Sequence, residues 1–208
     1  MKLILVSYPD FFKGETSIVS SLLDSYDFTF HLRKPQASKQ ELIDYLDEIP
    51  TRLHSKIVLH NEIEVFSSYK LEGMHFSGAK RESAQELAKT VTKGTSCHSI
   101  SEIKSLEKTF DYVYLSPIFE SISKQGYQGN LDMEEVKVFL EEAKQNQVYA
   151  LGGIAIENIH HIKQFAFDGL AVLGAVWTLN PLKNRDMIQS NFNKIYSKIQ
   201  SVYEKSNS

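Results

Sequence analysis

A loop rich in hydroxyl groups and ending in a lysine carries the clearest chemical signal in the sequence. It spans residues 116–124 and reads Ser-Pro-Ile-Phe-Glu-Ser-Ile-Ser-Lys. It follows the apolar run 112–115, which is typical of a buried strand. The hydroxyls of Ser121 and Ser123 and the ammonium of Lys124 can all donate hydrogen bonds to one anionic group. We therefore predict an anion-binding loop at the end of this strand.

Short apolar runs recur along the chain, with helical patterns between them. Such continuous runs suit parallel strands that are buried on both faces. Several intervening segments begin with Ser or Asp and have Glu three residues later, the capping box that starts a helix. This alternation predicts a single-domain α/β protein, a (β/α)8 TIM barrel. The alternative, a doubly wound sheet, needs a glycine-rich fingerprint after its first strand, and Tyr8-Pro9-Asp10 is not one. The runs are 3–7, 27–32, 56–59, 73–76, 95–97, 112–115, 148–151 and 169–173, and the helix starts are Ser38, Ser83, Ser99 and Asp132.

Chemistry-bearing residues follow several of these runs. In TIM barrels the functional groups gather at the carboxyl ends of the strands, so residues distant in sequence are expected to share one face. Arg33 follows the second run, and Ser96 lies near the end of the fifth. Gly153 and Gly174 follow the seventh and eighth, where glycines let backbone N–H groups approach a phosphate closely. The pattern predicts a phosphate-binding face.

These segments resemble those of the thiamine phosphate synthases and the related TenI thiazole tautomerases. Loop 116–124 is similar to their pattern G-P-I-F-x-T-x-T-K, and segment 31–35 to Q-L-R-x-K. Segment 151–154 is similar to their I-G-G-I. Because the resemblance runs from the first strand to the helix after the eighth, the chain is identified as a member of this superfamily. We expect one barrel over residues 1–203 and a frayed tail over 204–208.

The resemblance implies the synthase reaction. A pyrimidine-methyl group passes from its diphosphate to a thiazole phosphate, and diphosphate is released. The implied small-molecule partners are therefore a phosphorylated thiazole and a pyrimidine diphosphate. The implied ligands of the leaving diphosphate are Arg33, Ser96, Ser121, Ser123 and Lys124, those of the thiazole phosphate are Gly153 and Gly174, and His31 and Asn61 are further substrate contacts.

The implied magnesium site differs from the family pattern. Synthases seat Mg²⁺ with two aspartates, and Asn61 and Lys80 stand in their places. Mg²⁺ prefers carboxylate oxygens, so these replacements argue against a magnesium-dependent site and leave no residue assigned as a metal ligand. Glu62 is the one nearby carboxylate. Lys34 lies one position from Arg33, on the other side of the strand, and is expected to be a solvated charge.

Two alternative functions remain open. A TenI-like tautomerase needs a general acid/base, normally histidine, and TenI proteins place it where this chain has Pro117. His31 or His60 at the barrel rim could take that role. The second alternative is a non-catalytic binder of thiamine precursors or products. Of the other histidines, His75 is expected to pack within the barrel and His98 to orient the following helix.

Composition narrows the class of protein. The 208 residues suffice for one domain with a sizeable core, and a net charge of −3 without a basic stripe argues against nucleic acid as a partner. The single cysteine excludes an internal disulfide and suits a reducing compartment. No apolar run approaches the roughly 20 residues that span a bilayer. We expect a soluble cytoplasmic protein without a membrane partner, and an oligomer is compatible with the sequence.

Overall fold

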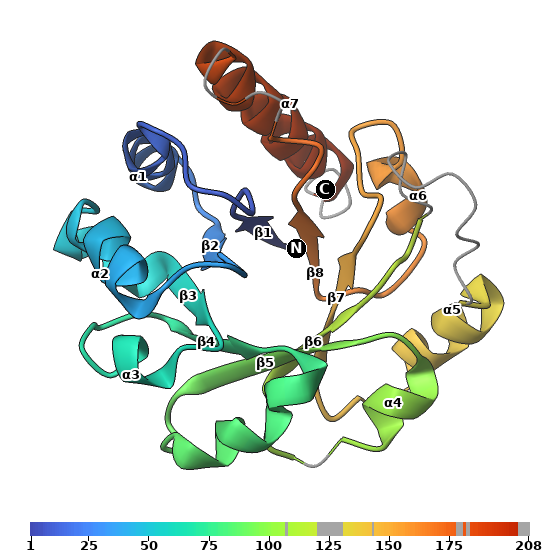
Figure 1. Cartoon of the computed structure of the whole chain (residues 1–208). Helices are drawn as coiled ribbons and strands as arrows, with labels where there is room; N and C mark the ends of the chain where they lie inside the picture. Colours follow the sequence, from blue (N-terminus) through green and yellow to red (C-terminus); the bar gives the residue numbers. More distant parts are fainter. Residues whose placement is uncertain (107, 120–130, 143, 178–180, 182–183, 204–208) are drawn as a thin grey trace.

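A closed barrel of parallel strands forms the centre of the computed structural model (Figure 1). The structure describes residues 1–106, 108–119, 131–142, 144–177, 181 and 184–203. The strands pair in sequence order, and β1 closes the barrel onto β8. Every predicted run contributes a strand, so the predicted (β/α)8 architecture is confirmed. The strands are β1 Lys2–Val6, β2 Thr29–Leu32, β3 Ile57–His60, β4 Gly73–Phe76, β5 Thr92–Cys97, β6 Tyr112–Leu115, β7 Gln147–Leu151 and β8 Gly169–Val172.

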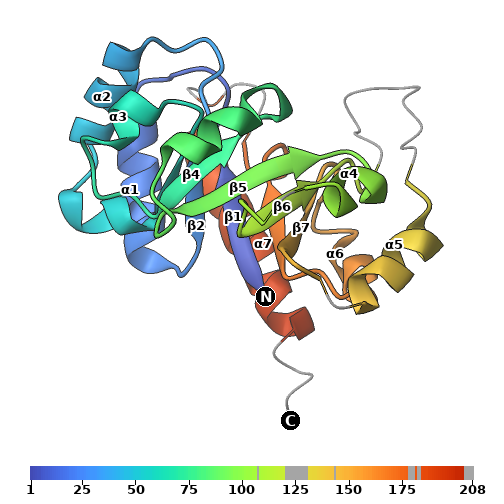
Figure 2. The same ribbon diagram turned by 90° about the horizontal axis from the view of Figure 1, so that it is seen from below.

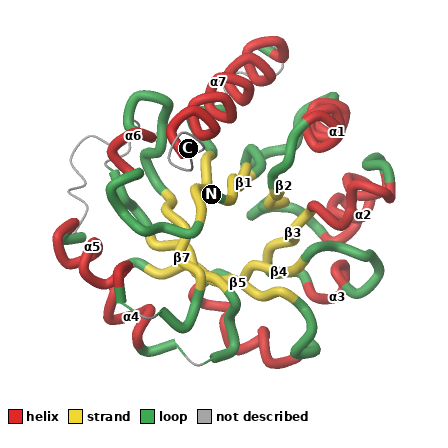
Figure 3. The backbone as a smooth tube through the Cα atoms, turned by 180° about the vertical axis from the view of Figure 1, so that it is seen from behind, coloured by secondary structure: helices red, strands yellow, loops and turns green. Residues whose placement is uncertain are grey.

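The helices form an outer ring around the strands, as the view from behind also shows (Figure 3). Within the described ranges, no helix combines the length and apolar character needed to cross a membrane. The first residue lies at the end of the barrel where the strands begin (Figure 2). The α-helices are α1 Glu15–Ser25, α2 Lys39–Asp47, α3 Ile63–Phe66, α4 Ile100–Lys104, α5 Met133–Glu141, α6 Ile159–Ile162 and α7 Arg185–Tyr203, and the 3-10 helices are η1 Thr51–Lys56 and η2 Gly78–Glu86.

Three of the four predicted helix starts are confirmed. Ser38 forms both hydrogen bonds of a capping box, and the side chains of Ser99 and Asp132 accept hydrogen bonds from N–H groups in the first turn of their helices. The prediction of a helix start at Ser83 is wrong. The chain there is already in the 3-10 helix η2, which begins five positions earlier, so the Ser-x-x-Glu pattern lies inside a helix instead of at its start.

Three clusters of buried side chains stabilise the barrel, and the two largest lie on opposite sides of the strands. Aliphatic and aromatic side chains fill the layer between the strands and the helices. The barrel interior instead contains stacked rings: Tyr112 and Tyr149 lie 5.1 Å apart between ring centroids, and His75 stacks on Tyr114 at 4.5 Å. TIM barrels are usually filled with branched aliphatic residues, so this interior is unusually polar.

Gly94 makes room for one of these rings. A Cβ atom at this position would lie 2.0 Å from the ring of Tyr112. We expect Gly94→Ala to lower the free energy of unfolding by about 1–3 kcal/mol, the usual cost of overpacking, in urea denaturation. The matched control is Gly174→Ala, because nothing lies within 4 Å of a Cβ added there. Equal stability of the two variants would contradict this account of the interior.

Candidate active site

A cavity of about 630 Å³ opens at the carboxyl ends of the strands. This volume is within the range of small-molecule sites. Arg33, Asn61 and Ser96, three of the residues predicted for the site, all line it, together with His60 and His75. The barrel topology therefore brings to one cavity the carboxyl ends of β2, β3, β4 and β5.

The backbone of Arg33 is fixed by hydrogen bonds to Ser7, and its guanidinium is exposed at the cavity. The Ser7 hydroxyl donates to the Arg33 carbonyl at 2.8 Å, and the Arg33 N–H donates to the Ser7 oxygen at 2.9 Å. The side chain is exposed, and no carboxylate among the described residues pairs with it. An arginine whose backbone is fixed and whose guanidinium has no carboxylate partner is suited to bind phosphate oxygens.

Lys34 is buried, so the prediction of a solvated charge is wrong. Its Nζ lies 2.6 Å from the Glu15 carboxylate, and both side chains are 1% exposed. It also donates to the carbonyls of Tyr8 and Asp10. Burial raises the pKa of Glu15 to about 7, although Lys34 acts in the opposite direction, and burial also lowers the pKa of Lys34. The pair fastens the loop between β1 and α1 to the end of β2, beside the cavity that Lys34 helps to line.

The residues that replace the magnesium-binding aspartates are already engaged. Asn61 has a left-handed backbone, with φ 65°, and its Oδ1 accepts a hydrogen bond from the Ser77 N–H at 2.9 Å. Lys80 lies 3.2 Å from Glu62, which is the only carboxylate among the described residues that line the cavity. A site with one carboxylate, itself paired with an ammonium, does not fit Mg²⁺.

Ser96 hydrogen-bonds a buried histidine. Its Oγ lies 2.9 Å from Nε2 of His75, whose Nδ1 is 3.2 Å from the Tyr112 hydroxyl. Burial, reinforced by the positive charges of Arg33 and Arg81, lowers the pKa of His75 to about 3, so its imidazole is neutral. The prediction that His75 packs within the barrel is confirmed.

Arg81 supports this end of the cavity, although no motif in the sequence marks it. It donates to Thr95 Oγ1 at 2.9 Å and to the Ser96 carbonyl, and it pairs with Glu102 at 2.6 Å. These partners lie on β5 and α4, so the contacts of Arg81 with them are visible only in the folded chain. Arg81 therefore fixes the backbone on which Ser96 stands.

His31 and His60 lie in contact at the floor of the cavity. Nδ1 of His31 is 3.1 Å from Nε2 of His60 and 2.7 Å from the Tyr114 hydroxyl. His60 lines the cavity, whereas His31 is 1% exposed and lies beneath it. Burial lowers the pKa of both well below the usual value for histidine, and neighbouring histidines add to the effect.

His98 contacts the start of the predicted anion-binding loop. Its Nδ1 lies 2.9 Å from the Ser116 carbonyl oxygen, and the ring is part of the cavity wall. An imidazole is thus present beside Pro117, the position where TenI proteins have their histidine. The remaining loop residues of the prediction, Ser121, Ser123 and Lys124, lie outside the described residues.

The two glycines lie just past the cavity wall. Leu151 and Leu173, which line the cavity, precede them on β7 and directly after β8. Gly153 has φ 64°, and its carbonyl accepts a hydrogen bond from Asn158 Nδ2 at 2.8 Å. Gly174 is exposed, with open space where a side chain would be.

Known proteins share this sequence pattern and this fold. A family model described as thiamine monophosphate synthase matches residues 3–176. The thiamine-phosphate synthase of Latilactobacillus sakei is 27% identical over 59% of the chain and 57% of that protein. The thiamine-phosphate synthase of Anoxybacillus flavithermus is 24% identical over 66% of the chain and 65% of that protein. The chain thus matches less than two thirds of the length of either relative.

Solved structures agree with the family match. A thiamine phosphate pyrophosphorylase from Bacteroides thetaiotaomicron has a TM-score of 0.81 and 30% identity, over 95% of this chain and 97% of that one. The corresponding protein from Pyrococcus furiosus has a TM-score of 0.77 at 19% identity, over 97% of this chain and 96% of that one, which supports the fold alone.

Proposed function

Because the chain belongs to the thiamine monophosphate synthase family, we propose that it transfers a pyrimidine-methyl group from its diphosphate to a thiazole phosphate. In this reaction the bond between the methylene carbon and the diphosphate oxygen breaks, and the diphosphate keeps the electron pair. The thiazole nitrogen then forms a new bond to that carbon. This chemistry requires placed positive charge and hydrogen-bond donors more than a protein acid or base.

The observation that carries this proposal is the guanidinium of Arg33, which pairs with no carboxylate in the described part of the chain and lines the same cavity as Ser96 and Asn61. In the proposal, Arg33 stabilises the charge that develops on the departing diphosphate, and Ser96 hydrogen-bonds to it. Lys124, Ser121 and Ser123 would close over the diphosphate from the loop after β6. Gly153 and Gly174 would bind the thiazole phosphate through backbone N–H groups. No step is assigned to Mg²⁺, because the described lining of the cavity offers it only Glu62, which is paired with Lys80.

The contribution of Arg33 to diphosphate binding can be measured with inorganic pyrophosphate as the only ligand. We expect Arg33→Ala to weaken the binding of inorganic pyrophosphate by about 1.5–3 kcal/mol in calorimetry, since charge-assisted hydrogen bonds are lost. Lys124→Ala should have a similar effect. Arg52→Ala is the matched control, because Arg52 pairs with Asp24 at the surface and does not line the cavity. Unchanged affinity in both Arg33→Ala and Lys124→Ala would refute the diphosphate site.

The thiazole phosphate site has its own test. Gly153→Val would strain the backbone, because valine is disfavoured at a φ of 64°. Gly174 has open space around it, so Gly174→Val should obstruct a phosphate there without disturbing the fold. We expect this variant to bind thiazole phosphate more weakly in calorimetry and to melt at the wild-type temperature. A folded variant with wild-type affinity would remove Gly174 from the site.

His98 supports a second candidate function, the TenI-like tautomerase. Its ring lies against Ser116, next to Pro117, so a neighbouring strand could supply the acid/base group that the loop lacks. Assays of both reactions on the same preparation distinguish the candidates. Turnover of the two synthase substrates supports the first function, and aromatisation of a thiazole carboxylate phosphate supports the second. Tight binding of thiamine phosphate without either turnover would indicate a non-catalytic binder.

A further inference from the structure

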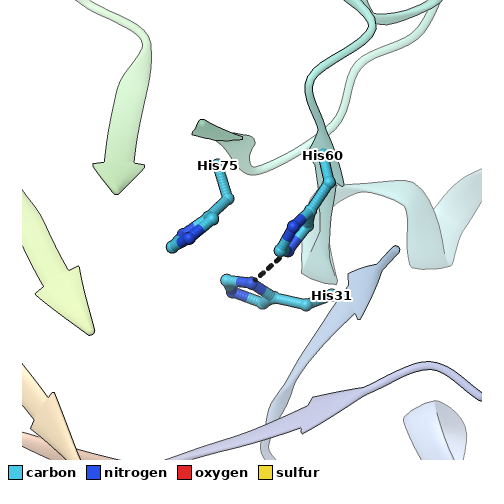
Figure 4. Close-up of side chains that lie close together, drawn as sticks. All are labelled: His31, His60 and His75. Atoms are coloured by element: carbon cyan, nitrogen blue, oxygen red, sulfur yellow. Dashed lines mark hydrogen bonds between the residues drawn. The ribbon is translucent and has the colours of Figure 1, made fainter. Parts of the chain in front are cut away.

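Three histidines from neighbouring strands converge inside the barrel (Figure 4). His31 comes from β2, His60 from β3 and His75 from β4. One ring nitrogen of each lies within 4.8 Å of the others, and all three side chains are buried. The strand register explains the convergence. His60 pairs with His75, and His31 pairs with Val58, two positions before His60, so all three point to the same side of the sheet.

The ring geometry is close to that of a metal centre. Nδ1 of His31 is 3.1 Å from Nε2 of His60. Two imidazoles bound to one tetrahedral Zn²⁺, with bonds of about 2.0–2.1 Å, have their nitrogens roughly 3.3 Å apart. The rings of His60 and His75 lie nearly parallel, with centroids 4.5 Å apart, and both approach His31. For one ion to bind all three rings, their nitrogens must come closer together than the 4.8 Å within which they now lie.

We propose that His31, His60 and His75 form a binding site for a late first-row divalent cation, Zn²⁺ in particular, with its fourth position open to the cavity. His60 and His75 line the cavity and His31 lies beneath it, so the free face of the triangle points toward the cavity. Three protein ligands and one open position are the arrangement of catalytic zinc sites. Three neutral imidazoles suit Zn²⁺ and not Mg²⁺, which prefers oxygen ligands.

Hydroxyl groups surround the histidines as outer partners. The Tyr114 hydroxyl lies 2.7 Å from His31 Nδ1, a contact that an ion bound to Nδ1 would replace, and 3.3 Å from Nε2, where it could remain as an outer partner. For His75, the Tyr112 hydroxyl is next to one ring nitrogen and the Ser96 hydroxyl is next to the other. Whichever nitrogen of His75 binds the ion, the other keeps a hydrogen-bond partner that orients the ring, as in other metal sites.

Charge indicates what the fourth ligand would be. The three imidazoles are neutral, so the ion would keep its two positive charges, and Arg33 adds a third on the same cavity wall. This arrangement favours an anion, such as a phosphate oxygen, at the open position. The site requires only the three histidines, so it stands independently of the synthase activity proposed above.

The experiment uses the full chain without an affinity tag, titrated with Zn²⁺ by calorimetry in the presence of a competing chelator. We expect one ion per chain, and at least about tenfold weaker binding in His60→Gln and in His31→Gln. The matched control is the double variant His160→Gln with His161→Gln, an exposed pair on α6. Its affinity should equal that of the wild type. Absence of binding, or binding that persists in both variants or is lost in the control, would overturn the proposal.

A second measurement does not depend on the folding of any variant. Crystals of the wild-type chain soaked with Zn²⁺ should show an anomalous peak between the three rings, and a peak only elsewhere would overturn the site. With Co²⁺ as the probe, the visible spectrum should show tetrahedral coordination and should shift when inorganic phosphate is added. A spectrum unchanged by phosphate would refute the open fourth position.

Discussion

Replacing Lys34 by methionine is expected to lower the free energy of unfolding by about 3–5 kcal/mol at pH 8, the usual cost of leaving a buried charge without its partner. The Glu15 carboxylate would lose the ammonium 2.6 Å away, and at 1% exposure it has almost no contact with water to replace it. The hydrogen bonds from Lys34 to the carbonyls of Tyr8 and Asp10 would be lost as well. Urea denaturation followed by circular dichroism measures the effect.

The loss should depend on pH. Burial raises the pKa of Glu15 in the folded protein from the usual 4.5 to about 7, and removing Lys34 raises it further. A carboxyl with a raised pKa binds a proton more readily in the folded state than in the unfolded state. The variant should therefore be closest to the wild type near pH 5, where Glu15 is protonated, and its defect should grow as the pH rises through 7 to 8.

Two further variants separate the charge effect from simple loss of packing. Lys39→Met removes a lysine from an exposed pair with Glu64, and it should change stability by less than about 1 kcal/mol. Lys34→Met combined with Glu15→Leu removes both charges and should recover much of the lost stability. A Lys34→Met defect that does not vary with pH, or that persists in full in the double variant, would show that packing is its cause.

Lys34 also shows why the sequence predicts the fold better than the site. The strands are visible as continuous apolar runs, because each is buried on both faces whatever its neighbours are. Lys34 looks like any charged residue after a strand. Its partner lies 19 residues away in α1, and the two meet only because the β1–α1 loop packs onto the end of β2. A buried ion pair between distant segments leaves no local pattern.

The histidines illustrate the same limit. The sequence predicts His31 and His60 at the barrel rim and His75 inside the barrel, whereas His31 is 1% exposed and lies beneath the cavity. Their proximity depends on the register of β2, β3 and β4, which the sequence does not specify. The prediction of a helix start at Ser83 is wrong because the 3-10 helix η2 already begins at Gly78, and Arg81 within η2 contacts residues of β5 and α4. Local sequence patterns predict the strands and most of the helices. The positions of the site residues depend on contacts between strands and helices that are distant in sequence.

Restoring both replaced aspartates together should raise synthase turnover at low Mg²⁺ more than restoring either one alone. We expect wild-type synthase turnover to be weak and to need unusually high Mg²⁺, since Lys80 would repel the ion where the family has a carboxylate. Asn61→Asp combined with Lys80→Asp should raise turnover at low millimolar Mg²⁺ by about tenfold or more, the scale on which metal-site changes act. Aspartate tolerates the left-handed backbone at position 61, so the first change should not strain the chain.

The structure explains why both changes are needed. Lys80 pairs with Glu62, so Asn61→Asp alone would place a second carboxylate beside an ammonium and extend an ion pair. Removing Lys80 releases Glu62, and the two changes together give three carboxylates at the ends of β3 and β4. Calorimetric titration of Mg²⁺ in the presence of pyrophosphate tests the same point without turnover, with Asn61→Asp as the matched control. Robust wild-type turnover at low millimolar Mg²⁺, unaffected by the double substitution, would show that this cavity neutralises diphosphate with its own cations, Arg33 among them.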